Sequence, residues 1–262
     1  SIMQETQSNC VPSSAVKAIS PDNISTGTFI GVGVGPGDPE LMTLKAFRLI
    51  SQADVLCFLV DSQGKSHAKS IAAEAIAANN LAVQYIPILM PMNKDRRLAN
   101  QHYDQASDAI QSQLALGKNV VFLCEGDPLF FGSYSYLLER IEDHFLCQVV
   151  PGISSVNAAA SALVQPLTRL TDAFAVVSGR HSAEFLRSTL RQYDSVVIMK
   201  AGQARGRIIQ ALADTKRSQD ASYLAYIGRE QEVIEHDISQ LSSDAGPYFS
   251  LFIVLRDERG RS

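Results

Sequence analysis

The chain has 262 residues, of which 46% are hydrophobic and 19% are charged, and its formal net charge is −4. This length allows one large domain or two smaller ones, because a single hydrophobic core stops growing near ~250–300 residues. No apolar run approaches the ~20 residues of a transmembrane helix, and the acidic balance argues against broad binding of nucleic acid, so an anionic ligand needs a local cluster of basic side chains.

Residues 1–27 form a polar segment that is rich in Ser, Asn and Pro. The segment has no apolar stretch typical of a signal peptide, and we expect a flexible leader. The four cysteines are widely spaced, and Cys57, Cys124 and Cys147 lie in apolar runs, where a reduced, buried thiol is usual. This cysteine usage favours a cytoplasmic protein. No cluster of Cys or His has metal-ligand spacing, so we expect no metal site.

Apolar runs of strand length alternate with helical patterns from residue 28 onward. Continuous apolar runs are typical of strands that are covered on both faces of a sheet. The expected strands are residues 28–34, 55–60, 81–88, 119–126 and 146–152. The expected helices are residues 44–52 with Thr43 as N-cap, 66–80, and 96–117 with Gly117 at the C-terminal end. This alternation predicts an α/β domain with a mostly parallel sheet.

After residue 150 expected strands and helices alternate again, but in a different arrangement. Strands are expected at 172–179, 194–202, 221–228, 231–238 and 248–256, and helices at about 154–163, 182–192 and 203–213. The last strands follow one another with only turns between them, which predicts a mixed sheet that ends in antiparallel pairs. The run "VVPGISS" combines Pro and Gly, so we place a domain boundary there. The domains are then residues 28–150 and 151–262.

A glycine-rich segment, "GVGVGPGDPE", begins inside the first expected strand and extends beyond its end. The dinucleotide fingerprint G-x-G-x-x-G opens directly into a helix. Here Gly31 and Gly33 fit the fingerprint, but Pro36 stands at its third glycine. Pro36 and Pro39 also remove two backbone donors, and the expected helix begins only near Leu44. The segment therefore favours a tight turn at the ligand-binding edge of a sheet over a pyrophosphate loop.

A second segment, "CEGDPLFFGS" at 124–133, repeats the arrangement of a buried strand followed by Gly-Asp-Pro. Two such turns at strand ends are expected to lie side by side, which favours a binding site at that edge. Asx-turn formation alone can also explain Asp38 and Asp127.

Three segments, "GVGVGPGDPELMTLKAFRLISQADV", "EGDPLFFGSYSYL" and "VVPGISSVNAAASALVQPL", agree in order and separation with one family. The chain resembles the tetrapyrrole methylases, which methylate carbon atoms of corrin and sirohaem precursors, over about residues 28–256. Within the family, "PMNKDR", "GKS", "GSYSYL" and "PYFSLFIV" are most similar to the branch that methylates carbon 20 of precorrin-2 or cobalt-factor II. The uroporphyrinogen branch carries "YDRLV" where this chain reads "CFLVDS".

The resemblance implies a homodimer with the two-domain tetrapyrrole methylase fold. S-adenosylmethionine lies folded in the interdomain cleft, and the N-terminal domain forms a trough for the anionic tetrapyrrole. The amides at the start of a helix after Pro-Gly suit the methionyl carboxylate of the cofactor. The implied cofactor-binding residues are Pro36, Glu125, Gly126, Asp127, Phe130, Ser154, Ser155, Met199, Gly228 and Pro247.

The proposed substrate bears eight carboxylates, so Lys and Arg must gather near it. Candidates are Lys45, Lys94, Arg96, Arg97 and Arg169, and the densest group is Lys94 to Arg97. The expected substrate contacts are Asp38, Lys94, Arg96 and Tyr134, although Tyr134 can instead pack against the following helix.

Methyl transfer requires alignment of two reactants and no covalent nucleophile, so the sequence identifies no catalytic residue. The acceptor of the departing proton is a side chain, a substrate carboxylate or water. Three alternatives remain: another methylase of the family, such as a uroporphyrinogen or precorrin-4 enzyme, a nicotinamide oxidoreductase, and a tetrapyrrole-binding protein without catalysis.

Overall fold

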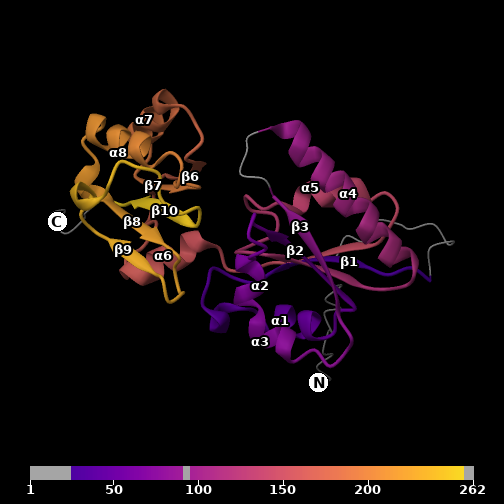
Figure 1. Ribbon diagram of the computed structural model, residues 1–262. Coiled ribbons are helices and arrows are strands. Elements are labelled where there is room, and N and C mark those ends of the chain that lie inside the picture. Colours follow the sequence, from indigo (N-terminus) through magenta and orange to yellow (C-terminus); the bar gives the residue numbers. More distant parts are fainter. Residues whose placement is uncertain (1–24, 91–94, 257–262) are drawn as a thin grey trace, which may run out of the picture.

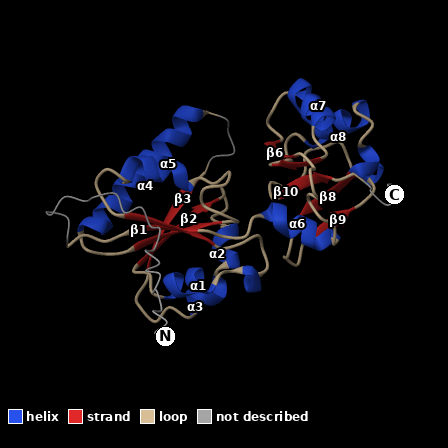
Figure 2. Ribbon diagram, turned by 180° about the vertical axis from the view of Figure 1, so that it is seen from behind, coloured by secondary structure: helices blue, strands red, loops and turns tan. Residues whose placement is uncertain are grey.

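The computed structural model describes residues 25–90 and 95–256, which form two α/β lobes (Figures 1 and 2). We call residues 25–150 the N-terminal lobe and residues 151–256 the C-terminal lobe. The leader expected at 1–27 lies almost wholly outside the described residues. Its last residue does not fit the expectation, because Gly27 is buried and its N–H donates to the Leu114 carbonyl at 2.8 Å. The N-terminal lobe therefore includes Gly27.

The N-terminal lobe contains a five-stranded sheet in the order β3-β2-β4-β1-β5, and every strand pair in it is parallel. Its strands are β1 (Phe29–Gly33), β2 (Val55–Val60), β3 (Gln84–Leu89), β4 (Val120–Cys124) and β5 (Cys147–Val150). The predicted parallel sheet is confirmed. Because parallel strands end at the same edge, the segments that follow β1, β4 and β5 are neighbours.

Helices cover both faces of this sheet (Figure 1). One face carries α1 (Leu44–Ser51), α2 (His67–Ile71) and α3 (Ala73–Ala77), and the other carries α4 (Arg96–Ala115) and α5 (Tyr134–Ile141). The short helix η2 (Pro39–Leu41) lies between β1 and α1 in the chain and buries none of its residues. Thr43 caps α1 as predicted, since its hydroxyl accepts the Ala46 N–H at 3.0 Å. The single helix expected at 66–80 is wrong. The chain leaves helical geometry at Ala72, and two short helices pack separately against the sheet.

The glycines of β1 serve close packing. Ile30 and Val32 face the helices α1 to α3, and Phe29 faces α4 and α5. A Cβ atom on Gly31 would lie 2.6 Å from the ring of Tyr134, so the absent side chain is where that ring packs. No α-helix opens directly from the turn after β1, since the short 3-10 helix η2 comes first and α1 begins only at Leu44. The arrangement is unlike a dinucleotide loop.

The C-terminal lobe contains a mixed five-stranded sheet in the order β6-β7-β10-β8-β9, in which only the β6–β7 pair is parallel. The predicted mixed sheet is confirmed, although β9 is much shorter than expected. One face packs against α6, and the other against α7 and α8. Its elements are α6 (Ser155–Leu163), β6 (Phe174–Ser178), α7 (Ala183–Gln192), β7 (Ser195–Met199), α8 (Arg205–Asp214), η3 (Ser218–Asp220), β8 (Ala221–Ala225), β9 (Val233–Glu235), η4 (Ile238–Gln240) and β10 (Ser250–Val254).

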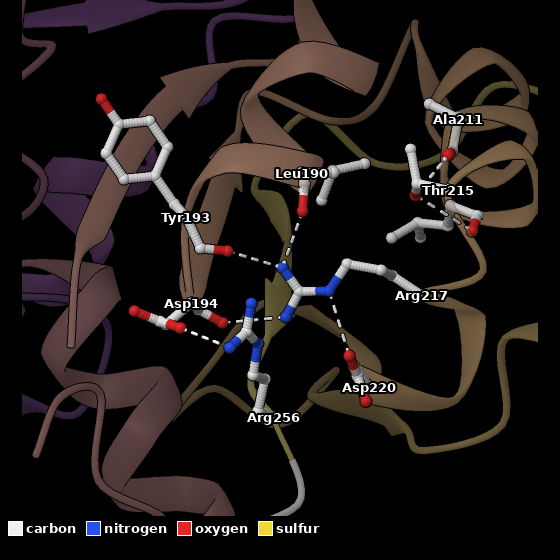
Figure 3. Close-up of polar contacts among 9 residues, drawn as sticks. Leu190, Tyr193, Asp194, Ala211, Thr215, Arg217, Asp220 and Arg256 are labelled. Carbon is white, nitrogen blue, oxygen red and sulfur yellow. Dashed lines mark hydrogen bonds and ion pairs between the residues drawn. The ribbon is translucent and has the colours of Figure 1, made fainter.

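A buried arginine joins the elements of the C-terminal lobe (Figure 3). The Arg217 guanidinium donates to the carbonyl oxygens of Leu190 at 3.0 Å, Tyr193 at 2.8 Å and Asp194 at 2.8 Å. Its Nε donates to the Asp220 carboxylate at 3.0 Å. These bonds satisfy carbonyls at the end of α7 and tie that end to the loop before β8.

Within residues 25–90 and 95–256, no helix combines the length and the apolar character that a bilayer crossing requires.

Candidate functional site

The two Gly-Asp-Pro turns lie side by side at the carboxyl edge of the N-terminal sheet. β1 and β4 are hydrogen-bonded neighbours, and beyond their ends Gly35 and Gly126 form an isolated bridge. The Gly126 N–H donates to the Gly35 carbonyl at 2.8 Å. The expected pairing of the two turns is therefore confirmed.

The second turn also contacts the Pro-Gly bend between the lobes. The Asp127 carboxylate accepts the Leu129 N–H at 2.9 Å through Oδ1 and the Gly152 N–H at 3.0 Å through Oδ2. A Cβ atom on Gly126 would lie 3.6 Å from the Cα of Ser154. Asp127 therefore forms the expected Asx turn and, with its other oxygen, joins the turn to the segment that leads into α6.

The beginning of α6 offers donors for an anion at this junction. Ser154 is the N-cap, and its Oγ accepts the Val156 N–H at 3.1 Å. Other N–H groups of a first turn have no partner inside a helix, and the positive end of the helix dipole lies there. Ser154 and Ser155 are half-buried. These residues fit an amino-acid carboxylate, which is the group expected from the sequence.

Glu125 lies at the end of β4 beside this junction. Burial raises the pKa of the Glu125 carboxyl, and hydrogen bonds from the backbone of Glu125 and Ala68 act in the opposite direction. The same carboxylate raises the pKa of the Tyr248 phenol, after the larger effect of desolvation. Tyr248 belongs to the C-terminal lobe, so the electrostatic effect of Glu125 extends to a side chain of the other lobe.

Met199 and Pro247 belong to the C-terminal lobe. Met199 is the half-buried last residue of β7. The Pro247 carbonyl accepts the Ser250 Oγ–H at 2.7 Å and lies close to Gly202, where a Cβ atom would be 2.6 Å from it. Lys200, which follows Met199, reaches the N-terminal lobe, where its Nζ lies 5.9 Å from the centroid of the Phe131 ring.

The lobes touch at the first Gly-Asp-Pro turn. Arg229 donates to the Gly37 carbonyl at 3.1 Å and to the Ser70 hydroxyl at 2.7 Å. His67 stacks on Phe249 with ring centroids 4.1 Å apart. These contacts hold the first turn and α2 against the segments that follow β8 and precede β10.

Asp38 and Gly228 meet in this lobe contact. A Cβ atom on Gly228 would lie 2.6 Å from the Asp38 backbone nitrogen, and Asp38 Oδ1 accepts the Glu40 N–H at 2.9 Å. The structure thus pairs a residue expected to bind substrate with one expected to bind cofactor. Both residues form contacts within the protein.

The expectation that Tyr134 contacts the substrate is wrong. Its ring has no exposed surface, stacks on Phe29 at 5.1 Å, and its hydroxyl donates to the Gln148 carbonyl at 3.1 Å. A substrate cannot reach it, because the aromatic ring fills the space left by Gly31. The alternative from the sequence was packing against the following helix, whereas the structure packs the Tyr134 ring against Phe29 and Gly31 of β1.

The remaining expected residues are scattered. Pro36 is buried in the first turn, and Phe130 is 37% exposed on the second.

Among the expected basic residues, Arg96 begins α4 and lies over the Tyr136 ring at 5.5 Å. Lys94 lies outside the described residues. Arg169 lines a separate pocket of the C-terminal lobe with Asp172 and Arg256, away from the turns.

Sequence reasoning missed three residues that form contacts between the lobes: His67, Lys200 and Arg229. Lys200 directly follows Met199, so its place beside an expected cofactor residue was a usable signal. No sequence feature distinguished His67 or Arg229 from ordinary surface residues. Across residues 25–90 and 95–256, no group of three or more His, Cys, Asp or Glu side chains is placed to hold a metal ion.

Comparisons with known proteins agree with this geometry. A family model described as Tetrapyrrole (Corrin/Porphyrin) Methylases matches residues 28–242. The precorrin-2 C(20)-methyltransferase of Sinorhizobium sp is 32% identical over 236 residues, which are 88% of this chain and 96% of that protein. Cobalamin biosynthesis protein CobIJ of Mycobacterium tuberculosis is 33% identical over 235 residues, and this chain spans 46% of its length.

Among solved structures, uroporphyrin-III C-methyl transferase from Thermus thermophilus, complexed with S-adenosylhomocysteine, has the same fold. Its TM-score is 0.61 at 24% identity, and the match covers 88% of this chain and 98% of that one.

Proposed function

Because this chain belongs to the tetrapyrrole (corrin/porphyrin) methylases, we propose that it transfers a methyl group from S-adenosylmethionine to carbon 20 of precorrin-2 or cobalt-factor II in cobalamin biosynthesis. The contact of Asp127 with Gly152 is the observation that carries the proposal. It joins the Glu-Gly-Asp-Pro turn to the Pro-Gly bend, which are the two segments expected to hold the cofactor.

The cofactor site in this proposal consists of the residues around that contact. The N–H groups at Ser154 and Ser155 bind the methionyl carboxylate at the positive end of α6. Gly126 leaves its backbone accessible because it has no side chain facing Ser154. Met199 and Pro247 form the opposite wall, on the C-terminal lobe. Glu125 lies between the walls as a hydrogen-bond acceptor.

S-adenosylmethionine supplies an activated methyl group on a sulfonium sulfur. The protein has to hold carbon 20 in line with that group, and good alignment is equivalent to an effective molarity on the order of 10⁵ M or more. No described side chain has to act as a nucleophile. The proton that leaves carbon 20 goes to a side chain, a substrate carboxylate or water.

Two titrations of the full chain test the cofactor. Calorimetry with S-adenosylhomocysteine should show binding, and calorimetry with NADH should show none. Binding of NADH alone would contradict the proposal, and binding of neither would favour a tetrapyrrole-binding protein without catalysis.

The substrate is tested by mass spectrometry of the product. Precorrin-2, with and without inserted cobalt, should gain one methyl group in the presence of S-adenosylmethionine, and isotope-labelled product should carry it on carbon 20. A methyl group on another carbon would reassign the chain to a different branch of the family.

A cytoplasmic location and a homodimer are also part of the proposal. Cys57 and Cys124 are free and buried, which supports a reducing compartment. The homodimer follows from the resemblance to the family, and sedimentation equilibrium of the full chain tests it.

A further inference from the structure

A pocket of about 230 Å³ lies between the lobes next to the cofactor residues. The second Gly-Asp-Pro turn and the first residues of α5 form one wall, and Lys200 from the end of β7 forms the other. The lining residues are Leu129, Phe131, Gly132, Ser133, Ser135, Tyr136 and Lys200. Since Tyr134 is buried, its neighbours Ser133, Ser135 and Tyr136 are the residues of this segment that face the pocket.

Two strained residues face each other across the pocket. Lys200 has a φ of 54° and Phe131 also has a φ of 54°, a left-handed conformation that glycine adopts far more easily than other residues. The Lys200 Nζ lies 5.9 Å from the centroid of the Phe131 ring, within the range of a cation–π contact. Strain of this kind often occurs at binding sites, although Lys216 also has it outside the pocket. Here it occurs on both lobes at one place.

The pocket attracts anions. Lys200 is its one charged lining residue, and among the described residues no carboxylate forms an ion pair with it. Burial lowers the pKa of Lys200, and the neighbouring Arg180 cation acts in the same direction to a smaller extent. Arg96 adds a third cation over the Tyr136 ring. An ammonium group that is partly removed from water and unpaired gains most from a carboxylate ligand.

We propose that this pocket binds one carboxylate side arm of the macrocycle and that Lys200 is the cation that holds the arm. The inference rests on the proposed function and names a subsite for its substrate. A volume of about 230 Å³ is below the ~300 Å³ of the smallest pockets for drug-sized ligands, so the pocket admits an arm and excludes the ring. A macrocycle with carboxylate arms around its rim has several similar orientations. An anchored arm selects one of them and thereby determines which carbon faces the methyl group.

The test compares Lys200→Gly, Lys200→Ala and Lys200→Arg in the full chain. Three quantities are measured: KM for the tetrapyrrole, Kd for S-adenosylhomocysteine by calorimetry, and Tm. Loss of one charge-assisted contact should raise KM by about 10- to 100-fold in the Gly and Ala variants, with less effect for Arg, while Kd for the cofactor product stays within about twofold. Tm of Lys200→Gly should equal or exceed that of the wild type, because glycine relieves the left-handed strain.

Lys216 provides a matched control. It is an exposed lysine of the same lobe with a φ of 57°, and it lies outside the pocket. Lys216→Gly should likewise maintain or raise Tm, but it should leave KM unchanged. An unchanged KM in Lys200→Gly would overturn the proposal, and an equal loss of affinity for S-adenosylhomocysteine would assign Lys200 to the cofactor instead.

Direct binding separates this inference from the proposed methylation. Quenching of the fluorescence of uroporphyrin, an octacarboxylate tetrapyrrole, measures affinity without turnover. If the wild type binds uroporphyrin but methylates no precorrin-2, weaker binding by Lys200→Ala would support the subsite while the proposed reaction fails. Equal binding by the wild type and Lys200→Ala would overturn the subsite even if methylation at carbon 20 is observed.

Discussion

Arg217 is a cation that is 7% exposed, and its guanidinium has four oxygen partners in the C-terminal lobe. Three of these partners are backbone carbonyls near the end of α7, where the helix itself leaves acceptors without donors. The planar fork of arginine reaches several of them at once, which the single ammonium of lysine cannot do. Arg217 therefore supplies donors to the carbonyl groups at the end of α7, and the same hydrogen bonds offset the free-energy cost of burying its charge.

Replacing Arg217 with Met should lower the free energy of unfolding by about 3–5 kcal/mol, because buried acceptors and the Asp220 carboxylate lose their donor. Arg217→Lys should recover only part of this loss. Urea denaturation followed by circular dichroism measures both variants. Arg191→Ala serves as the control, since Arg191 is exposed on α7 and a surface change of this kind stays within about 0.5 kcal/mol. A Met variant as stable as the control would contradict this account.

At the scale of elements, the two Gly-Asp-Pro turns share a sequence and differ in their contacts. Each aspartate accepts an N–H two residues ahead, Glu40 in the first turn and Leu129 in the second. Only Asp127 uses its other oxygen on the Pro-Gly bend, through Gly152. The second turn is therefore coupled to α6, whereas the first is held by Arg229 and Gly228.

The Asp127→Asn substitution separates these contacts. One side-chain oxygen remains for the Leu129 N–H, but the amide nitrogen cannot accept from Gly152. Kd for S-adenosylhomocysteine should rise by about tenfold, as expected for one lost charge-assisted hydrogen bond, with a small change in Tm. Calorimetry measures the affinity. Asp38→Asn makes the same chemical change in the first turn and should affect the affinity far less, so an equal loss in the two variants would show that the Gly152 contact has no special role.

At the scale of the whole molecule, the relative position of the lobes depends on few side chains. Arg229 reaches Gly37 and Ser70, and the His67 ring packs against Phe249 and Tyr226. Burial, together with the nearby Arg229 cation, lowers the pKa of His67 to about 4. His67 is therefore neutral at neutral pH, and the lobe contact is built for the neutral ring.

Acid should weaken this contact. The unfolded chain protonates histidine near its ordinary pKa of about 6.5, whereas the folded state resists protonation down to about pH 4, so the unfolded state binds more protons in this window and stability falls as pH falls. The loss attributable to His67 should be on the order of 2–3 kcal/mol and complete below pH 4. Denaturation of wild type and His67→Phe between pH 7 and pH 4 measures the difference. His67→Phe retains the ring stacking and does not titrate, so parallel curves would refute the assignment.

Local sequence determined most of the elements. Apolar runs such as "VLCFLV" specify buried strands through hydrophobicity alone, and Thr43 and Gly117 mark helix ends through their own backbone preferences. The similar position of the two turns also followed from the sequence, because parallel strands must end at one edge. The break at Ala72 did not follow, since alanine favours helix on either side and packing on the sheet decided the geometry there.

The sequence by itself determined the two α/β lobes, their parallel and mixed sheets, and the family, since these depend on patterns of neighbouring residues and on motif order. Only the tertiary structure decided that Tyr134 fills the space beside Gly31, that Asp127 contacts Gly152, and that Lys200 faces Phe131 across the lobes. These contacts join residues that lie between 25 and 103 positions apart in the sequence, and they determine which of these side chains are buried. Their energies depend on distance and on removal from water, and neither quantity is defined until the chain has folded.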